Sequence, residues 1–233
     1  MKTELLHRIE TNLENFRLKV QPTIETQYVN DGIIDVEKYL EAPVKILWVL
    51  KEAHSTDDSI SDMREAIATL REGNSISPGW GKTFKPIVYS IYGAFNGMNW
   101  LDIPDINGNP EVLDCIKSTA YINVKKYAGG AQAIDKEVSN FYNEYSDLLN
   151  EQIDIINPDV IIFGGTMKYF NTESFLRYGN KTFNDESESH LQKYLYGNKL
   201  LLSTLHPNNR SVTQQKYCDS IIQAINEWKV EIK

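Results

Sequence analysis

The sequence predicts an α/β fold: one domain of three layers, with helices on both faces of a central four-stranded parallel sheet. Short apolar runs typical of buried strands alternate with longer segments of helical periodicity, and this alternation favours a parallel sheet. The expected strands are Val44–Leu50, Thr119–Val124, Val160–Phe163 and Lys199–Leu205. With 233 residues, 41% of them hydrophobic, the chain is long enough to bury a full core as a single domain over residues 1–233.

The first two helices are expected where apolar residues recur every three or four positions. One spans residues 5–16, close to the start of the chain. The other spans residues 63–70, with Ser59 or Ser61 as its N-terminal cap and Gly73 as its stop.

Three more helices follow from the same periodicity. Pro86 is expected in the first turn of a helix that runs to Tyr92, because proline fits there without losing a hydrogen bond. A long amphipathic helix covers residues 138–156 and ends before Asn157-Pro158. A last helix over residues 221–228 closes the chain.

Composition excludes several classes of function. The net charge is −8, from 24 basic and 32 acidic residues, which argues against broad electrostatic binding to nucleic acid but leaves room for a local basic face. Cys115 and Cys218 are far apart and form no metal-binding pattern, as expected in a reducing compartment. The amino terminus does not resemble a signal sequence, and no apolar run approaches ~20 residues. We therefore expect a cytoplasmic monomer with no membrane partner and no bound metal.

The candidate site lies at the carboxyl ends of the four strands. Open α/β sheets bind ligands in the crevice at these ends. The strand ends carry Glu52, His54, Asn123, Gly164 and His206, which are therefore expected to face one pocket.

Three of these side chains suit catalysis or recognition. His206, held by the following proline, can donate a hydrogen bond to an oxygen that gains negative charge; the alternative is a histidine satisfied by a backbone group. Asn123 offers one acceptor and two donors, which suits the edge of a base; an asparagine that bonds a neighbouring loop is the commoner case. Glu52 can orient or deprotonate a water, or it is simply a solvated loop carboxylate.

Other candidates are weaker when taken singly. Trp80 lies in a turn-rich segment and either stacks on a base or packs onto the domain. Gly164 and Gly165 form a tight turn before a helix where a phosphate can approach, but they lack the spacing of a dinucleotide fingerprint or a P-loop. The basic residues expected near the pocket rim are Lys51, Lys82, Lys125, Lys126 and Arg210.

Taken in order, four segments resemble the uracil-DNA glycosylase superfamily, most closely its bacterial family 4 branch, which carries an iron–sulfur cluster. LKEAHS is similar to the branch's Gly-Glu-Ala-Pro-Gly motif, with Glu52 and Ala53 matching. YINVKK is similar to its Asn-Val-Val-Lys strand end through Asn123. INPDVIIFGGT is similar to its strand that follows a proline and ends in glycine, through Pro158 and Gly164, and LHPNNR resembles its His-Pro-Ser motif with the trailing arginine.

The resemblance implies an enzyme that flips a nucleotide out of DNA and hydrolyses the N-glycosidic bond of uracil or a modified pyrimidine. By the match, Asn123 reads the flipped base, in a pocket that includes Ala53 and His54. His206 stabilises the departing base, and Glu52 helps to place the water. The expected DNA contacts are Lys51, Lys125, Lys126, Asn208, Asn209 and Arg210.

The chain also departs from the family pattern. The cluster-ligating cysteines are missing, so no cofactor is expected. Lys51, His54 and Asn208 replace a glycine, a proline and a serine of the motifs. The stacking phenylalanine has no counterpart; ungapped matching puts Gly79 there, and Trp80 is the nearest ring.

Because of these departures, three alternatives to uracil excision stay open. The first alternative is an enzyme that excises a hypermodified, for example glucosylated, pyrimidine from viral DNA, as some superfamily members do. The second is a module that binds modified DNA without catalysis. The third is a hydrolase of free nucleosides or nucleotides, which the net negative charge favours.

Overall fold

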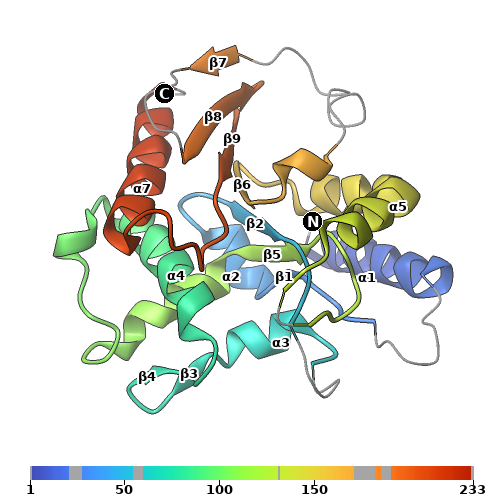
Figure 1. Cartoon of the computed structure of the whole chain (residues 1–233), viewed down its shortest axis with the longest axis horizontal. Helices are drawn as coiled ribbons and strands as arrows, with labels where there is room; N and C mark the ends of the chain where they lie inside the picture. The colour runs from blue at the N-terminus through green and yellow to red at the C-terminus, as the bar shows by residue number, and fades with distance from the viewer. Residues whose placement is uncertain are drawn as a thin grey trace.

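The computed structural model describes residues 2–20, 28–54, 60–130, 132–170, 182–184 and 190–231. These residues form an α/β fold in which helices flank a mixed, mostly parallel sheet (Figure 1). The strands of this sheet are β1 (Gly32–Ile33), β2 (Ile46–Leu50), β5 (Ala120–Asn123), β6 (Val160–Gly164), β7 (Thr182–Asn184), β8 (Leu191–Tyr196) and β9 (Lys199–Thr204). Their spatial order is β1-β5-β2-β6-β9-β8-β7.

The four predicted strands are confirmed as the parallel centre of the sheet, in the order β5-β2-β6-β9. In register, Leu50 pairs with Asn123, and Gly164 pairs with Thr204. The ends of these strands therefore meet at one edge, as the predicted site requires.

The prediction of four strands is too low, because antiparallel strands extend the sheet at both sides. β1 pairs with β5, β8 pairs with β9, and β7 pairs with β8. β1 has only two residues, and β8 is mostly part-exposed, so neither has the all-apolar pattern of a central strand. Of residues 178–190, the structure describes β7 and His190; the others lie outside the described residues.

Helices cover both faces of the sheet and create two apolar cores (Figure 1). Along β2, Ile46, Trp48 and Leu50 belong to one core, while Leu47 and Val49 belong to the other, as the two-residue period of a strand requires. The first core is covered by α3 (Met63–Ala68), α4 (Gly81–Asn96), the 3-10 segment η2 (Pro110–Ser118) and α7 (Gln214–Glu231). The second is covered by α1 (Lys2–Lys19), α2 (Val36–Glu41) and α5 (Asp135–Ile156).

The helix predicted over residues 63–70 is confirmed as α3, which begins at Met63 as expected, but the predicted cap and stop residues are wrong. Asp62 caps it, since its carboxylate accepts the Arg64 N–H at 2.8 Å; the predicted cap Ser61 does not, and Ser59 lies outside the described residues. Gly73 instead lies between β3 (Arg71–Glu72) and β4 (Ser75–Ile76) with a φ of 58°.

Of the later helices, α5 agrees with the prediction, whereas the predicted place of Pro86 in the first turn of its helix is wrong, because Pro86 lies inside α4. α5 ends where expected, at Asn157 in the left-handed conformation with a φ of 46°. α4 begins before Pro86, because the Trp80 carbonyl already accepts the N–H groups of Thr83 and Phe84. Two further 3-10 segments are η1 (Trp100–Asp102) and η3 (Met167–Tyr169). Across the described part of the chain, no helix combines the length and the apolar character needed to span a membrane.

Candidate functional site

A cavity of about 660 Å³ opens at the carboxyl ends of β2 and β5, between the start of α4 and the loop after β9. Many of the residues expected at the site line it. They are Lys51, Glu52, Ala53, His54, Trp80, His206 and Asn208. The chain therefore brings together residues that are more than 150 positions apart in sequence by way of the parallel sheet.

His206 presents a neutral imidazole to the cavity. Its Nδ1 accepts the main-chain N–H of Asn208 at 3.1 Å, so the proton of the neutral ring is on Nε2. Burial, together with the nearby charge of Lys51, lowers the pKa of His206 below its ordinary value of 6.5. At neutral pH this ring is therefore an Nε2–H donor.

Glu52 is held at the cavity wall by Lys125. The Lys125 ammonium lies 2.8 Å from the Glu52 carboxylate and 2.7 Å from that of Glu137. Burial by itself lowers the pKa of Lys125, but the hydrogen bonds to Glu137 and Glu52 raise it above the ordinary value. Gly129 also lies against Glu52, because a Cβ built on Gly129 would overlap Oε1. The carboxylate is thus fixed from two sides while it remains part of the cavity lining.

Three aromatic rings form one wall of the cavity. Trp80 and Phe84 have ring centroids 5.3 Å apart, and Phe84 and Tyr121 are 5.7 Å apart. Sequence reasoning identified Trp80 but missed the other two. The signals were present: Phe84 lies four residues after Trp80 on a helix, and Tyr121 shares a strand face with Asn123.

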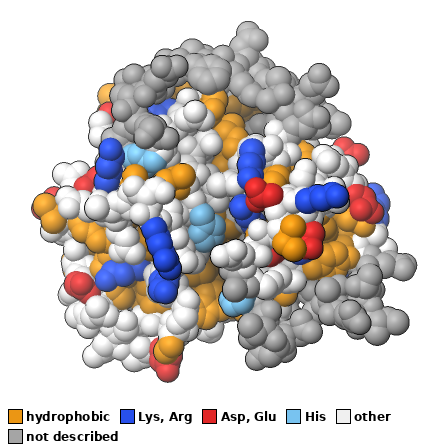
Figure 2. All heavy atoms as spheres, viewed as in Figure 1, with side chains coloured by type: hydrophobic (Ala, Val, Ile, Leu, Met, Phe, Trp, Pro, Cys, Tyr) orange, Lys and Arg blue, Asp and Glu red, His pale blue; other side chains and the backbone are white. Residues whose placement is uncertain are grey.

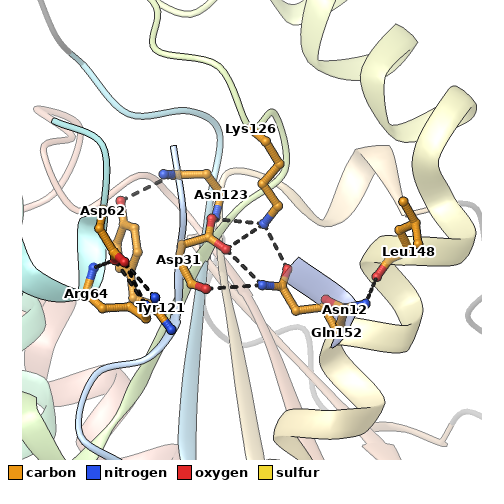
Figure 3. A network of polar contacts seen from close by, with 9 residues as sticks. All are labelled: Asn12, Asp31, Asp62, Arg64, Tyr121, Asn123, Lys126, Leu148 and Gln152. Carbon is orange, nitrogen blue, oxygen red and sulfur yellow. Dashed lines mark hydrogen bonds and ion pairs between the residues drawn. The ribbon is translucent and has the colours of Figure 1, made fainter. Parts of the chain in front are cut away.

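Asn123 does not line the cavity, although it was expected to read a base there. Its side chain is only 1% exposed, and its Oδ1 accepts the hydroxyl of Tyr121 at 3.3 Å. Its main-chain N–H donates to Asp31 at 2.7 Å (Figure 3). The Nδ2 group has no hydrogen-bond partner among the residues described. Asn123 therefore lies behind the cavity wall and contacts it through its hydrogen bond with Tyr121.

The predicted DNA contact at Lys126 is wrong, because this side chain is fully buried. Its ammonium pairs with Asp31 instead of facing solvent. Lys51 and Lys125 are also paired with acids of this chain, Lys51 with Asp135 at 2.7 Å. On the face shown in Figure 2, acidic side chains lie beside several of the basic ones. Much of the expected basic face is therefore neutralised internally.

The loop after β9 exposes two of its three predicted DNA contacts. Asn208 and Arg210 are exposed, and Asn208 lines the cavity. Asn209 shapes the loop, since its Oδ1 accepts the N–H groups of Ser211 and Val212 at 3.1 Å each.

The glycine turn after β6 is explained by packing. Gly165 has a φ of 76°, and its N–H already donates to the carbonyls of Phe163 and Thr204. A Cβ on Gly164 would overlap the side chain of Leu50. Neither glycine lines the cavity, and the Gly165 amide is not free to bind a phosphate.

Two further findings concern ligands and relatives. Within the described ranges, no three His, Cys, Asp or Glu side chains converge in a way that can hold a metal ion.

No protein-family model matches the chain, and no curated protein matches it in sequence.

Proposed function

We propose that the protein is a monofunctional DNA glycosylase that hydrolyses the N-glycosidic bond of a flipped-out uracil or modified pyrimidine. One observation carries the proposal: the Nε2–H donor of His206 and the carboxylate of Glu52 line the same aromatic-walled cavity. A hydrogen-bond donor and a carboxylate are the two groups that hydrolysis with an anionic leaving base requires.

In the proposed reaction, the bond between C1′ and the base nitrogen breaks, and the electron pair leaves with the base. His206 donates its Nε2–H to the base oxygen on which negative charge collects. Glu52 orients the water whose oxygen bonds to C1′. One proton of that water ends on the released base, which leaves an abasic sugar. A donor in the position of His206 typically contributes about 3–4 kcal/mol to lowering the barrier.

The aromatic wall supports base flipping. Extruding a base costs a few kcal/mol, and stacking of one base on an aromatic ring returns about 1–3 kcal/mol. Phe84 and Tyr121, with Trp80 beside them, supply such rings in a chain whose sequence offers no direct counterpart of the family's stacking phenylalanine.

DNA would meet few unpaired cations at the cavity. Lys82 lines it, and Arg210 follows the His206 loop; both are exposed and form no ion pair with the part of the chain that is described. Since each neutralised phosphate steepens the salt dependence of binding, we expect a shallow one.

A second candidate substrate is a bulky, hypermodified pyrimidine, as in viral DNA. The cavity of about 660 Å³ favours it. Cavities of roughly 300–1,000 Å³ hold drug-sized ligands, and a bare pyrimidine is far smaller than those.

The test is a substrate panel. Duplexes with uracil, hydroxymethylcytosine or its glucosylated form, and native phage DNA, are incubated with the protein and then treated with alkali to reveal abasic sites. The proposal expects cleavage of at least one substrate and its loss in His206→Ala. Saturable binding without base release indicates a binding module instead. Release from mononucleotides alone indicates a nucleotide hydrolase.

A further inference from the structure

A closed polar network lies behind the candidate site, formed by Asp31, Lys126 and Gln152 (Figure 3). We call it the Asp31 network. The Lys126 ammonium is 2.7 and 2.9 Å from the two carboxylate oxygens of Asp31 and 2.8 Å from Oε1 of Gln152. The Gln152 amide donates back to Asp31 Oδ1 at 2.9 Å. The three N–H groups of the ammonium thus meet three acceptors.

Stability alone does not account for this network. Both charged side chains are 0% exposed, and taking an ion pair out of water costs free energy that its attraction often fails to return. Burial lowers the pKa of Lys126, and the charge of Asp31 offsets this only in part. Well-packed apolar residues are often as stable in such places, so a role beyond stability is expected.

The network holds the end of β5. Asp31 Oδ2 accepts the main-chain N–H of Asn123 at 2.7 Å. β1 pairs with β5 only at Gly32 and Ile33, so Asp31 takes over as acceptor where this edge strand begins. Asp31 therefore anchors the main chain of Asn123, and through it Tyr121, whose hydroxyl donates a hydrogen bond to the Asn123 side chain.

The same network reaches Glu52 through neighbouring lysines. Lys126 enters the network, while Lys125 turns to the other side and binds Glu52 at 2.8 Å. We propose that Asp31 and Lys126 are positioning residues, which fix the end of β5 so that Tyr121 and Glu52 keep their places in the cavity. This inference rests on the proposed glycosylase function.

The test removes both charges together, with Asp31→Leu and Lys126→Met in one chain. This variant leaves no buried charge unpaired, so it is expected to fold, with a Tm below that of the wild type because the Asn123 N–H and the Gln152 amide lose their acceptor. Its kcat for base release falls about 10- to 100-fold, the typical loss when supporting residues are removed, while KM changes less. The Asn123 main-chain amide resonance shifts and its hydrogen exchange accelerates. The control is Lys193→Met with Glu227→Leu, which removes the ion pair between β8 and α7, outside the cavity lining, and leaves all of these readouts unchanged.

A double variant that folds and keeps both the wild-type kcat and the Asn123 resonance overturns the proposal. If that variant does not fold, Gln152→Leu removes one member and leaves Asp31 beside Lys126; an unmoved Asn123 resonance then overturns it. If the wild type releases no base, the proposed function fails. The Asn123 resonance and exchange rate still decide whether the network holds the end of β5.

Discussion

The main chain of Gly129 lies so close to the carboxylate of Glu52 that no other residue type fits without moving it. Glu52 is nearly buried and paired with Lys125, so it has little freedom to yield. Gly129→Ala is therefore expected to displace the carboxylate and reduce kcat for base release on the order of 100-fold, the typical effect of a misplaced group. Gly130→Ala is the matched control, since nothing lies within 4 Å of a Cβ there. Equal rates for the two variants contradict the role proposed for Glu52.

His206→Ala is expected to reduce the rate of base release on the order of 100- to 1,000-fold with the fold intact, because it removes the proposed donor to the leaving base. Single-turnover rates and circular dichroism measure the two effects. His54→Ala, an exposed position of the same cavity, serves as control and is expected to lose far less. A His206→Ala enzyme with the wild-type rate excludes the proposed mechanism.

The fall in base-release activity at low pH is expected to follow the protonation of His206. Its folded pKa is below the ordinary 6.5, so the unfolded chain takes up the proton first as pH falls. The stability that this group contributes is thus present above about pH 6.5 and is lost as the pH falls toward the folded pKa. Activity is expected to persist below pH 6.5 and to fall only when the folded ring gains its proton and Nδ1 stops accepting from Asn208.

Lys51→Met is expected to raise the pKa of His206, because the Lys51 charge helps to keep the ring neutral. The other charged or titratable groups in the cavity lining are Glu52, His54, Lys82 and Tyr121. Imidazole NMR titrations of wild type, Lys51→Met and a Lys82→Met control measure the shift. An unchanged midpoint in Lys51→Met rules out this electrostatic coupling.

Trp80→Leu is expected to weaken substrate binding about 10- to 100-fold, through the loss of about 1–3 kcal/mol of stacking. Trp100→Leu is the control, since Trp100 packs against Tyr89 and does not line the cavity. Affinity for duplex substrate, measured by fluorescence anisotropy, separates the two variants. If both bind equally well, Trp80 only packs onto the domain.

Lys126→Met alone is expected to lower the free energy of unfolding by about 3–5 kcal/mol, because Asp31 is left buried without its partner. Lys193→Met removes a part-exposed pair and is expected to cost about 1 kcal/mol or less. Urea unfolding at pH 7 compares them.

The parallel centre of the fold could be predicted because its strands are nearly all apolar, a pattern that few other structures produce. β1 was missed because two residues carry no periodicity, and β8 because a strand near the sheet edge keeps polar residues. His206 and Glu52 could be predicted from their positions after strands. The neutral state of the His206 ring could not be predicted, because it depends on contacts with Asn208 and Lys51. The fixed position of the Glu52 carboxylate could not be predicted either, because it depends on the ion pair with Lys125.

The different environments of Lys125 and Lys126 could not be predicted from the sequence. Two adjacent lysines after a strand favour a basic rim, yet one of them is buried. That outcome depends on Asp31, 95 positions away, and no local pattern indicates such a partner. Asn123 is similar: its residue type suits base recognition, but in the folded strand its Oδ1 accepts the hydroxyl of Tyr121, and Tyr121 lines the cavity while Asn123 does not.

The Asp31 network also bears on how the protein folds. It joins segments 95 and 121 residues apart, and the buried charge of Lys126 is neutralised only when the segment with Asp31 is in place. An intermediate in which β1 was detached from β5 would leave the Lys126 ammonium buried without its carboxylate partner, with Gln152 as its remaining acceptor in the network. Such an intermediate is too high in free energy to accumulate, so the edge of the sheet and the cavity are expected to form and to unfold in a single cooperative step.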